Sequence, residues 1–205
     1  MGLTMDTLTS ILLGIGLSAA CGFRVFVPML FMSIAALSGH LTFAPGFAWI
    51  GTYPALITLT VATLLEIGGY YIPWLDHFLD TLATPAAIVA GTLVTAAMVT
   101  KMDPMLKWSL AVIVGGGIAG LVQGSTVLAR ATSTATTAGF GNPALATIEL
   151  GGSTVIAGMV LLLPWLTALL LLLSIIFFGK RFIKVAKLVV ARVKRIPQRM
   201  QHLKG

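Results

Sequence analysis

The residues best able to do chemistry in this chain are five ionisable side chains that lie within or beside long apolar runs. They are Arg24, Glu66, Asp76, His77 and Asp80. A charged side chain at the centre of a membrane helix costs about 2.5–3.5 kcal/mol or more, so it usually faces a partner charge, water or a ligand. Arg24 stays protonated and needs an acceptor, which we expect among the three acids. The alternative is an arginine that snorkels to the interface or braces a helix kink.

The three acids allow more than one role. A buried Glu66 could bind a proton, as in a proton-coupled carrier, or could make a structural hydrogen bond. Asp76 and Asp80 are four residues apart and share a helical face, with His77 one step round. Their segment could be an interfacial helix with a wet acidic side, or it could fold into the core beside Arg24. The ligand types would suit a metal ion, but the spacing matches no established metal motif, so we predict no metal and no cofactor.

No catalytic signature accompanies these residues. The sequence has no Ser–His–Asp pattern and no HExxH motif. The glycine-rich run "GGGIAG" at residues 115–120 lies in an apolar segment without a preceding strand, so it indicates helix packing rather than nucleotide binding. We therefore predict no catalytic residue, and an enzyme is the less favoured interpretation.

The composition places these residues in a membrane protein. Of the 205 residues, 58% are hydrophobic and 9% are charged, and the mean hydropathy is +1.01. A soluble domain carries about 25% charged residues. The apolar runs are continuous, rich in Leu, Ala and Gly, and match the roughly 20 residues that a spanning helix needs. The predicted fold is therefore an all-α integral membrane protein.

We predict about five transmembrane helices, two of which are long or broken. The apolar segments cover about residues 8–38, 54–72, 84–100, 108–130 and 148–178. The first and the last are too long for one straight span of about 30 Å. They contain Pro28 and Pro164, so we expect tilt, a kink or two half-helices. Pro73 is expected to begin a new helix after a further break.

The basic residues predict the orientation. Nine of the 13 Lys and Arg lie between residues 180 and 204, and a basic tail beside a membrane helix marks the cytoplasmic side. The loop with Lys101 and Lys107 is predicted to be cytoplasmic as well. Counting five spans back from the tail places the N-terminus outside and the C-terminus in the cytoplasm.

Residues 1–178 are interpreted as one transmembrane domain, followed by a basic amphipathic cytoplasmic tail at residues 179–205. The tail is predicted to lie on the membrane and to bind anionic lipid headgroups. The residues for this contact are Lys180, Arg181, Lys184 and Lys187. Nucleic acid is disfavoured as a partner, because the tail has few aromatic residues and no folded binding module.

The chain also repeats itself. "PALITL" at Pro54 recurs as "PALATI" at Pro143, and "PWL" at Pro73 recurs at Pro164. Small residues recur upstream in the same order. They are Gly14, Ser18 and Gly22 in the first copy, and Gly116, Gly120 and Gly124 in the second. Such stripes allow close helix packing, within the chain or across a homodimer, which we also predict.

With the predicted topology, the copies at about residues 10–83 and 112–178 would be inverted across the membrane. Inverted repeats are typical of transporters, in which broken helices meet near the midplane and form a binding site. The second copy is less charged, and its Arg130 lies one turn beyond the position that aligns with Arg24. The polar site is therefore expected to be asymmetric.

The patterns "GLSAACGFRVFVPML" and "LLEIGGYYIPWLDHFLDTL" resemble the bacterial DUF4126 membrane-protein family. In that family an early Gly-Phe/Leu-Arg helix precedes an acid, a proline and two aspartates. The matching residues here are Gly22, Arg24, Glu66, Pro73, Asp76 and Asp80. With "NPALATIEL" in the second half, the resemblance spans about residues 10–178. It implies a multi-pass protein of the bacterial inner (cytoplasmic) membrane. It implies no activity, because the family has no assigned function.

Three functions fit these patterns. The favoured one is a small inverted-repeat transporter or channel for an ion or small solute, in which Arg24 would bind an anion and the carboxylates a cation or proton. The first alternative is a non-catalytic scaffold or lipid-organising protein. The second is a lipid translocase or intramembrane lipid-handling enzyme. The predicted binding or transport residues are Arg24, Glu66, Asp76, His77, Asp80 and Arg130.

Overall fold

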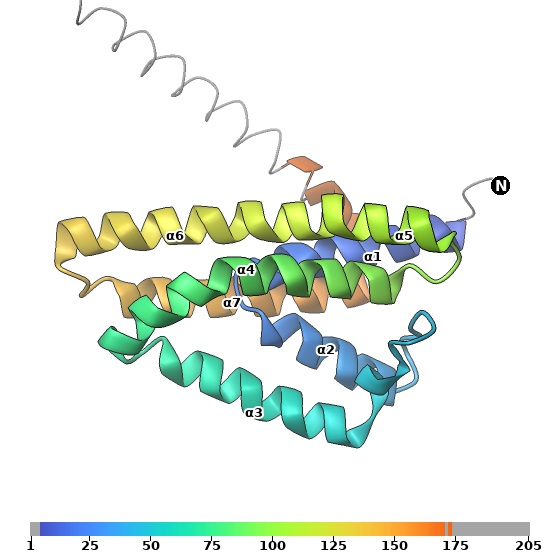
Figure 1. Ribbon diagram of the computed structural model, residues 1–205, viewed down its shortest axis with the longest axis horizontal. Helices are drawn as coiled ribbons and strands as arrows, with labels where there is room; N and C mark the ends of the chain where they lie inside the picture. The colour runs from blue at the N-terminus through green and yellow to red at the C-terminus, as the bar shows by residue number, and fades with distance from the viewer. Residues whose placement is uncertain (1–4, 171, 174–205) are drawn as a thin grey trace, which may run out of the picture. The chain divides into compact units, whose positions relative to one another are not determined.

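The computed structural model describes residues 5–170 and 172–173, and the secondary structure in this part of the chain is helical (Figure 1). Residues 1–167 form one unit and residues 168–205 another; the elements below belong to the first. The predicted tail at 179–205, with its headgroup contacts at Lys180, Arg181, Lys184 and Lys187, lies outside the described residues. The side chains of Asp76 and His77 are not described either.

The described elements follow one another as helices joined by short turns, except for a ten-residue connection between α2 and η1. They are α1 (Met5–Cys21), α2 (Phe26–Leu37), a 3-10 helix η1 (Ala48–Gly51), α3 (Tyr53–Gly69), α4 (Pro73–Met98), α5 (Pro104–Leu110), a π-helical segment η2 (Ala111–Gly116), α6 (Gly117–Thr137) and α7 (Asn142–Leu162). The elements α5, η2 and α6 form one continuous helix of 34 residues.

Three of these helices are long and apolar enough to cross a membrane. They cover Phe78–Met98, Pro104–Thr137 and Asn142–Leu162. Three shorter apolar helices, Met5–Cys21, Phe26–Leu37 and Tyr53–Gly69, accompany them. The all-helical membrane class therefore holds, whereas the structure divides the predicted five spans into three long helices and three short ones.

The first apolar segment is broken into two helices, and the break lies before Pro28. The chain leaves α1 after Cys21 and begins α2 at Phe26. Pro28 lies in the first turn of α2, where a missing N–H group costs nothing because it would have no partner in the helix. Pro73 is the first residue of α4. The chain also leaves the helical conformation at Leu163, directly before Pro164.

Helix α1 packs against α4, α6 and α7 through small and hydroxyl side chains. The Ser18 hydroxyl donates to the carbonyl of Gly91 at 2.7 Å, and the Thr95 hydroxyl donates to that of Gly14 at 3.2 Å. Ser153 of α7 donates to the carbonyl of Ala20 at 3.0 Å. Hydrogen bonds of this kind join helices where no water competes.

The predicted small-residue stripes have unequal roles. A Cβ atom added at Gly14 would lie 3.1 Å from Thr95 Cα, and one at Gly22 would lie 2.5 Å from Val122 Cβ. Cβ atoms added at Gly116 and Gly120 would lie 3.3 Å and 3.0 Å from side-chain atoms of Ile88 in α4. At Gly124 an added Cβ would meet no described atom within 4 Å. Within the described residues, Gly124 thus makes no close helix contact. The homodimer stays a prediction.

The start of α1 lies at the same end of the molecule as the loop after α4. The two helices are antiparallel, because Gly14 lies beside Thr95 and Ser18 bonds to Gly91. In addition, Lys101 Nζ lies 3.0 Å from Asp6 Oδ2. The sequence-based prediction placed the N-terminus and the Lys101 loop on opposite sides of the membrane, and this is wrong.

The physical reason is the break between α1 and α2. The two helices run in opposite directions along α7. Along α1 the contacts with α7 run backwards, because Ala20 meets Ser153 and Gly16 meets Val160. From the turn into α2 they run forwards, because Phe23 meets Gly152 and Phe31 meets Gly158. The chain therefore turns back at residues 22–25 and returns to the end from which it came (Figure 1). We name α1 and α2 the re-entrant pair. The first predicted span therefore begins and ends at the same end of the helix bundle.

The two sequence matches do not share one inverted relation. Helices α1 and α6 carry the small-residue match and run side by side in the same direction. Gly14 of α1 and Gly115, just before α6, both lie against Thr95. Further along both helices, Gly22 meets Ala119 and Val122. Helices α3 and α7, which begin with the "PAL" match, run in opposite directions (Figure 1). Inverted copies would require both pairs to be opposed, so the predicted inversion is not found.

Candidate functional site

The carboxylate of Glu66 holds the beginning of α2. Its Oε1 accepts a hydrogen bond from the Val25 N–H at 2.8 Å, and its Oε2 accepts one from the Phe26 N–H at 3.1 Å. These N–H groups lie at the start of a helix and have no partner within it. A negative charge is also favourable beside the positive end of the helix dipole. Because Glu66 belongs to α3, these bonds tie α3 to the turn of the re-entrant pair.

Arg24 lies in that turn and is 1% exposed. Its Nη2 donates to the carbonyl of Ala146 at 2.9 Å and lies 3.4 Å from Glu149 Oε2. Its guanidinium carbon is 3.8 Å from the centroid of the Tyr70 ring, a cation–π contact. Its Nε and Nη1 have no hydrogen-bond partner in the described part of the chain. A buried donor left unpaired costs about 1–3 kcal/mol.

Arg130 of α6 completes a buried charge cluster. Its Nε donates to Glu149 Oε1 at 3.0 Å, and its Nη2 donates to Glu149 Oε2. A two-point arginine–carboxylate contact of this kind is the strongest form of ion pair. Arg130 Nε also lies 3.7 Å from Asp80 Oδ1, and its guanidinium carbon is 4.4 Å from the Tyr70 ring centroid. The charge cluster is thus Arg24, Arg130, Asp80, Glu149 and Tyr70.

The structure assigns partners that differ from those expected. Arg24 was expected to pair with Glu66, Asp76 or Asp80, but its described ion pair is with Glu149. Glu66 bonds instead to backbone N–H groups, and Asp80 approaches Arg130. The surroundings of Asp76 and His77 lie outside the described side chains, so their predicted roles stay predictions.

Two residues of the site escaped the sequence analysis. Glu149 lies at the start of an apolar segment, where the cost of an intramembrane charge would have marked it as a candidate. Tyr70 follows α3 directly, and its ring contacts both arginines. No signal in the sequence singles it out, because an aromatic residue near a helix end is common in membrane proteins.

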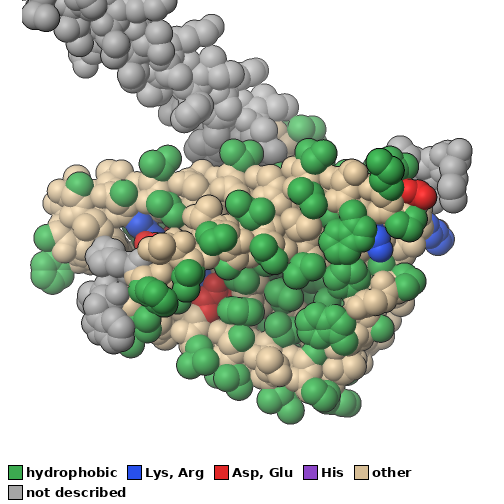
Figure 2. Space-filling view, viewed as in Figure 1, with side chains coloured by type: hydrophobic (Ala, Val, Ile, Leu, Met, Phe, Trp, Pro, Cys, Tyr) green, Lys and Arg blue, Asp and Glu red, His purple; other side chains and the backbone are tan. Residues whose placement is uncertain are grey.

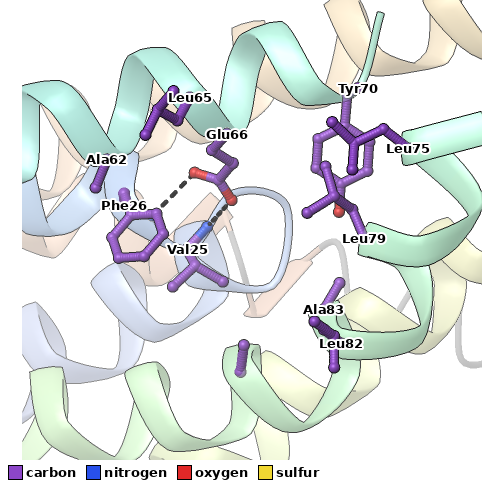
Figure 3. Close-up of a pocket in the computed structure, with 11 residues that line it drawn as sticks. Val25, Phe26, Ala62, Leu65, Glu66, Tyr70, Leu75, Leu79, Leu82 and Ala83 are labelled. Atoms are coloured by element: carbon purple, nitrogen blue, oxygen red, sulfur yellow. Dashed lines mark hydrogen bonds between the residues drawn. The ribbon is translucent and has the colours of Figure 1, made fainter. Parts of the chain in front are cut away.

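A pocket of about 520 Å³ lies between α3, α4 and the beginning of α2 (Figure 3). This volume is in the range of small-molecule sites. Its walls are mostly apolar, and the polar groups at its edge are Glu66 and Tyr70. The apolar lining includes Val25, Phe26, Leu65, Leu79, Leu82 and Ala86.

The pocket is accessible from the side of the helix bundle. Two of its lining residues, Leu65 on α3 and Leu82 on α4, are 70% and 49% exposed. Figure 2 shows acidic atoms in a hollow that apolar side chains surround on this face. In a membrane, such an opening faces lipid chains rather than water.

The site combines an apolar pocket with a buried charge cluster. Among the described side chains, no three His, Cys, Asp or Glu residues lie close enough together to hold a metal ion. Tyr70 connects the two features of the site, because its ring lines the pocket and also covers the guanidinium groups of the charge cluster. The charged groups available to a ligand are the Glu66 carboxylate in an apolar pocket and, beside the pocket, the buried guanidinium groups of Arg24 and Arg130.

Comparison with known proteins agrees with the family that the sequence patterns resemble. No curated protein and no solved structure matched the chain. A family model described as "Domain of unknown function (DUF4126)" matches residues 11–183, which is well over half of the chain. The chain therefore belongs to the DUF4126 family.

Proposed function

We propose that this protein is a membrane-embedded carrier for an amphipathic small molecule, which it binds in the pocket between α3 and α4. The observation that carries the proposal is a largely apolar pocket of about 520 Å³ with the Glu66 carboxylate at its edge. The apolar part of the ligand would fill the pocket, and a cationic or hydrogen-bond-donating group would meet Glu66. This narrows the transporter interpretation from any small solute to an amphipathic one.

Glu66 can bind a ligand while it holds α2. A carboxylate offers about four lone-pair positions, and the N–H groups of Val25 and Phe26 occupy two of them. The surrounding walls are apolar, so the charge is poorly screened and attracts a cation more strongly than it would in water. Glu66 would thus recognise the charge of the ligand.

The apolar walls favour a carrier over an ion channel. A conducting path for an ion needs oxygen ligands or a hydrated lining along its length, whereas the described pocket lining is dominated by Leu, Ala, Val and Phe side chains. An amphipathic molecule already dissolved in the membrane can enter through the lateral opening at Leu65 and Leu82. Helix α3 is the element best able to move, because it packs mainly on α2 and η1 and only lightly on α4.

The charge cluster also favours a second candidate, a non-transporting scaffold. Arg130 and Glu149 form a two-point ion pair, and Glu66 caps a helix. Both contacts would serve a protein whose buried charges only specify its packing. A scaffold of this kind would not need a ligand-sized pocket, so a binding experiment separates the two candidates.

The test is binding of three matched probes to the protein in lipid nanodiscs, with empty nanodiscs as the blank. The probes are dodecylamine, 1-dodecanol and dodecanoate, which share one chain and differ in charge. The proposal expects dodecylamine to bind about tenfold tighter than dodecanol, which corresponds to about 1.4 kcal/mol, and dodecanoate to bind weakest. Glu66→Gln should remove the preference for the amine.

A second pair of variants tests the location. Ala86 lines the pocket, so Ala86→Phe should fill it and weaken binding of all three probes. Val61 is 50% exposed on α3 and is not part of the lining, so Val61→Phe is the matched control and should change nothing. If no probe binds above the blank, the carrier is rejected in favour of the scaffold. Entry of dodecyltrimethylammonium into proteoliposomes then tests transport itself.

A further inference from the structure

We propose that Arg24 forms an oxyanion subsite, so that the molecule carried in the pocket is a zwitterionic amphiphile. Its cationic group would meet Glu66, and its anionic group would meet the unpaired N–H groups of Arg24. This inference rests on the proposed function and specifies its substrate class. The shared chemistry is a phosphate or carboxylate group beside an amine.

The first support is the state of the Arg24 side chain. It is 1% exposed, and of its three nitrogens only Nη2 has hydrogen-bond or ion-pair partners among the described residues, the Ala146 carbonyl and Glu149. Its Nε and Nη1 have none there. Buried donors without a partner are rare in native structures and call for a water or a ligand to complete them. A guanidinium group suits an oxyanion, because its donors are planar and spread over three nitrogens.

The second support is the sharing of one carboxylate by two arginines. Glu149 accepts two hydrogen bonds from Arg130 and is 3.4 Å from Arg24. Asp80 approaches the cluster on the Arg130 side, at 3.7 Å. Arg24 therefore has the weaker contact of the two arginines with the carboxylate that they share.

The third support is the position of Arg24 relative to the pocket. Arg24 directly precedes Val25, whose N–H group binds Glu66 and whose side chain lines the pocket. The Glu66 carboxylate, which would bind the cationic group, is thus held by the residue that follows Arg24 in the turn. The Tyr70 ring separates the two subsites, since it lines the pocket and lies 3.8 Å from the Arg24 guanidinium carbon. Arg24 is not among the residues that line the pocket, and Tyr70 lies in the short turn between α3 and α4. The proposed subsite therefore requires this turn to move when the ligand binds.

The experiment compares four probes on the protein in phosphatidylcholine nanodiscs. They are dodecylamine, dodecyl phosphate, a dodecanoyl lysophosphatidylethanolamine and inorganic phosphate. The expected result is that the zwitterion binds at least about tenfold tighter than the amine. Arg24→Lys, which keeps the positive charge for Glu149 but loses the spread donors, should reduce the zwitterion-to-amine affinity ratio. Val61→Phe, outside the site, should leave that ratio at its original value.

Each contrary outcome has one meaning. A zwitterion no tighter than the amine, or an affinity ratio that Arg24→Lys leaves unchanged, overturns the oxyanion subsite while the carrier stands. Arg24-dependent binding of inorganic phosphate as tight as that of dodecyl phosphate overturns the amphiphile and assigns the subsite to a free ion. Failure of the amine itself to bind the unmodified protein refutes the proposed function instead. Folding of Arg24→Lys is checked by its elution volume and thermal transition.

Discussion

At the scale of single residues, the buried charges divide into two arrangements with different consequences. Glu66 binds backbone N–H groups at the beginning of α2, whereas Glu149 binds the side chains of two arginines. Removal of one member of a buried ion pair leaves the other charge buried without compensation. Glu149 is therefore the residue on which the stability of the charge cluster depends most.

We predict that Glu149→Gln lowers the free energy of unfolding by about 3–5 kcal/mol, since it leaves Arg130 and Arg24 buried without their common carboxylate. The measurement is reversible unfolding in mixed micelles, followed by circular dichroism. The matched control is Asp6→Asn, which breaks an ion pair whose side chains are 62% and 75% exposed and should have little effect. Equal losses in the two variants would show that the charge cluster contributes no special stability.

The sequence predicted part of this site. It identified Arg24 and Glu66 as intramembrane charges, because each is conspicuous in an apolar run, and it named Asp80 as a candidate whose segment could be interfacial or buried. It did not predict the pairing, because residues far apart in the chain meet only after the first segment has folded back. Glu66 was expected to meet an arginine, and its actual partners are backbone N–H groups that exist only where α2 begins.

At the scale of elements, the contact between α1 and α6 depends on close approach of their backbones. A Cβ atom at Gly22 would lie 2.5 Å from Val122 Cβ and 2.7 Å from the Ala119 carbonyl oxygen. The carbonyl belongs to a helix and cannot give way as a flexible side chain would. Gly124 belongs to the second predicted stripe of small residues, but a Cβ atom added there would meet no described atom within 4 Å.

We predict opposite effects of the same substitution at these two glycines. Gly22→Ala should destabilise the protein by about 1–3 kcal/mol through overpacking. Gly124→Ala should be neutral or stabilise it by up to about 1 kcal/mol, because alanine has the higher helix propensity. Thermal unfolding of the two variants under identical conditions provides the comparison. A Gly22→Ala protein as stable as the unmodified one would contradict the close contact of α1 with α6.

At the scale of the whole molecule, the turn between α1 and α2 decides the topology. The start of α1, the end of α2 and the loop after α4 lie at one end, while the α6–α7 turn lies at the other (Figure 1). The continuous helix Pro104–Thr137 joins these ends and is about 50 Å long at 1.5 Å per residue. The N-terminus and the Lys101 loop should therefore face the same compartment.

We predict that cysteines introduced by Asp6→Cys and Lys107→Cys are labelled from the same side of the membrane, and that one introduced by Phe140→Cys is labelled from the other. Cys21, the one native cysteine, is buried and is first replaced by alanine. The measurement uses a membrane-impermeant maleimide on sealed vesicles, with detergent-opened vesicles as the control. Labelling of the Asp6 and Phe140 positions from one side would contradict the re-entrant pair.

The sequence established the helical membrane class, and it identified the first apolar run as too long for one straight span. It could not show that the two pieces run in opposite directions, because hydropathy records whether a residue is apolar and carries no information on chain direction. The predicted placement of the N-terminus opposite the Lys101 loop was wrong for this reason. The predicted inversion of the repeats depended on the same count of crossings and was not confirmed.

The measurement that tests the central claim most directly is photolabelling of the reconstituted protein with a diazirine-bearing dodecylamine, followed by mapping of the labelled residues. The carrier proposal predicts labels on the pocket residues Leu79, Leu82 and Ala86, which excess dodecylamine removes and which Glu66→Gln weakens. Labels confined to lipid-facing residues such as Ile57 and Val61, unaffected by excess dodecylamine or by Glu66→Gln, would contradict it.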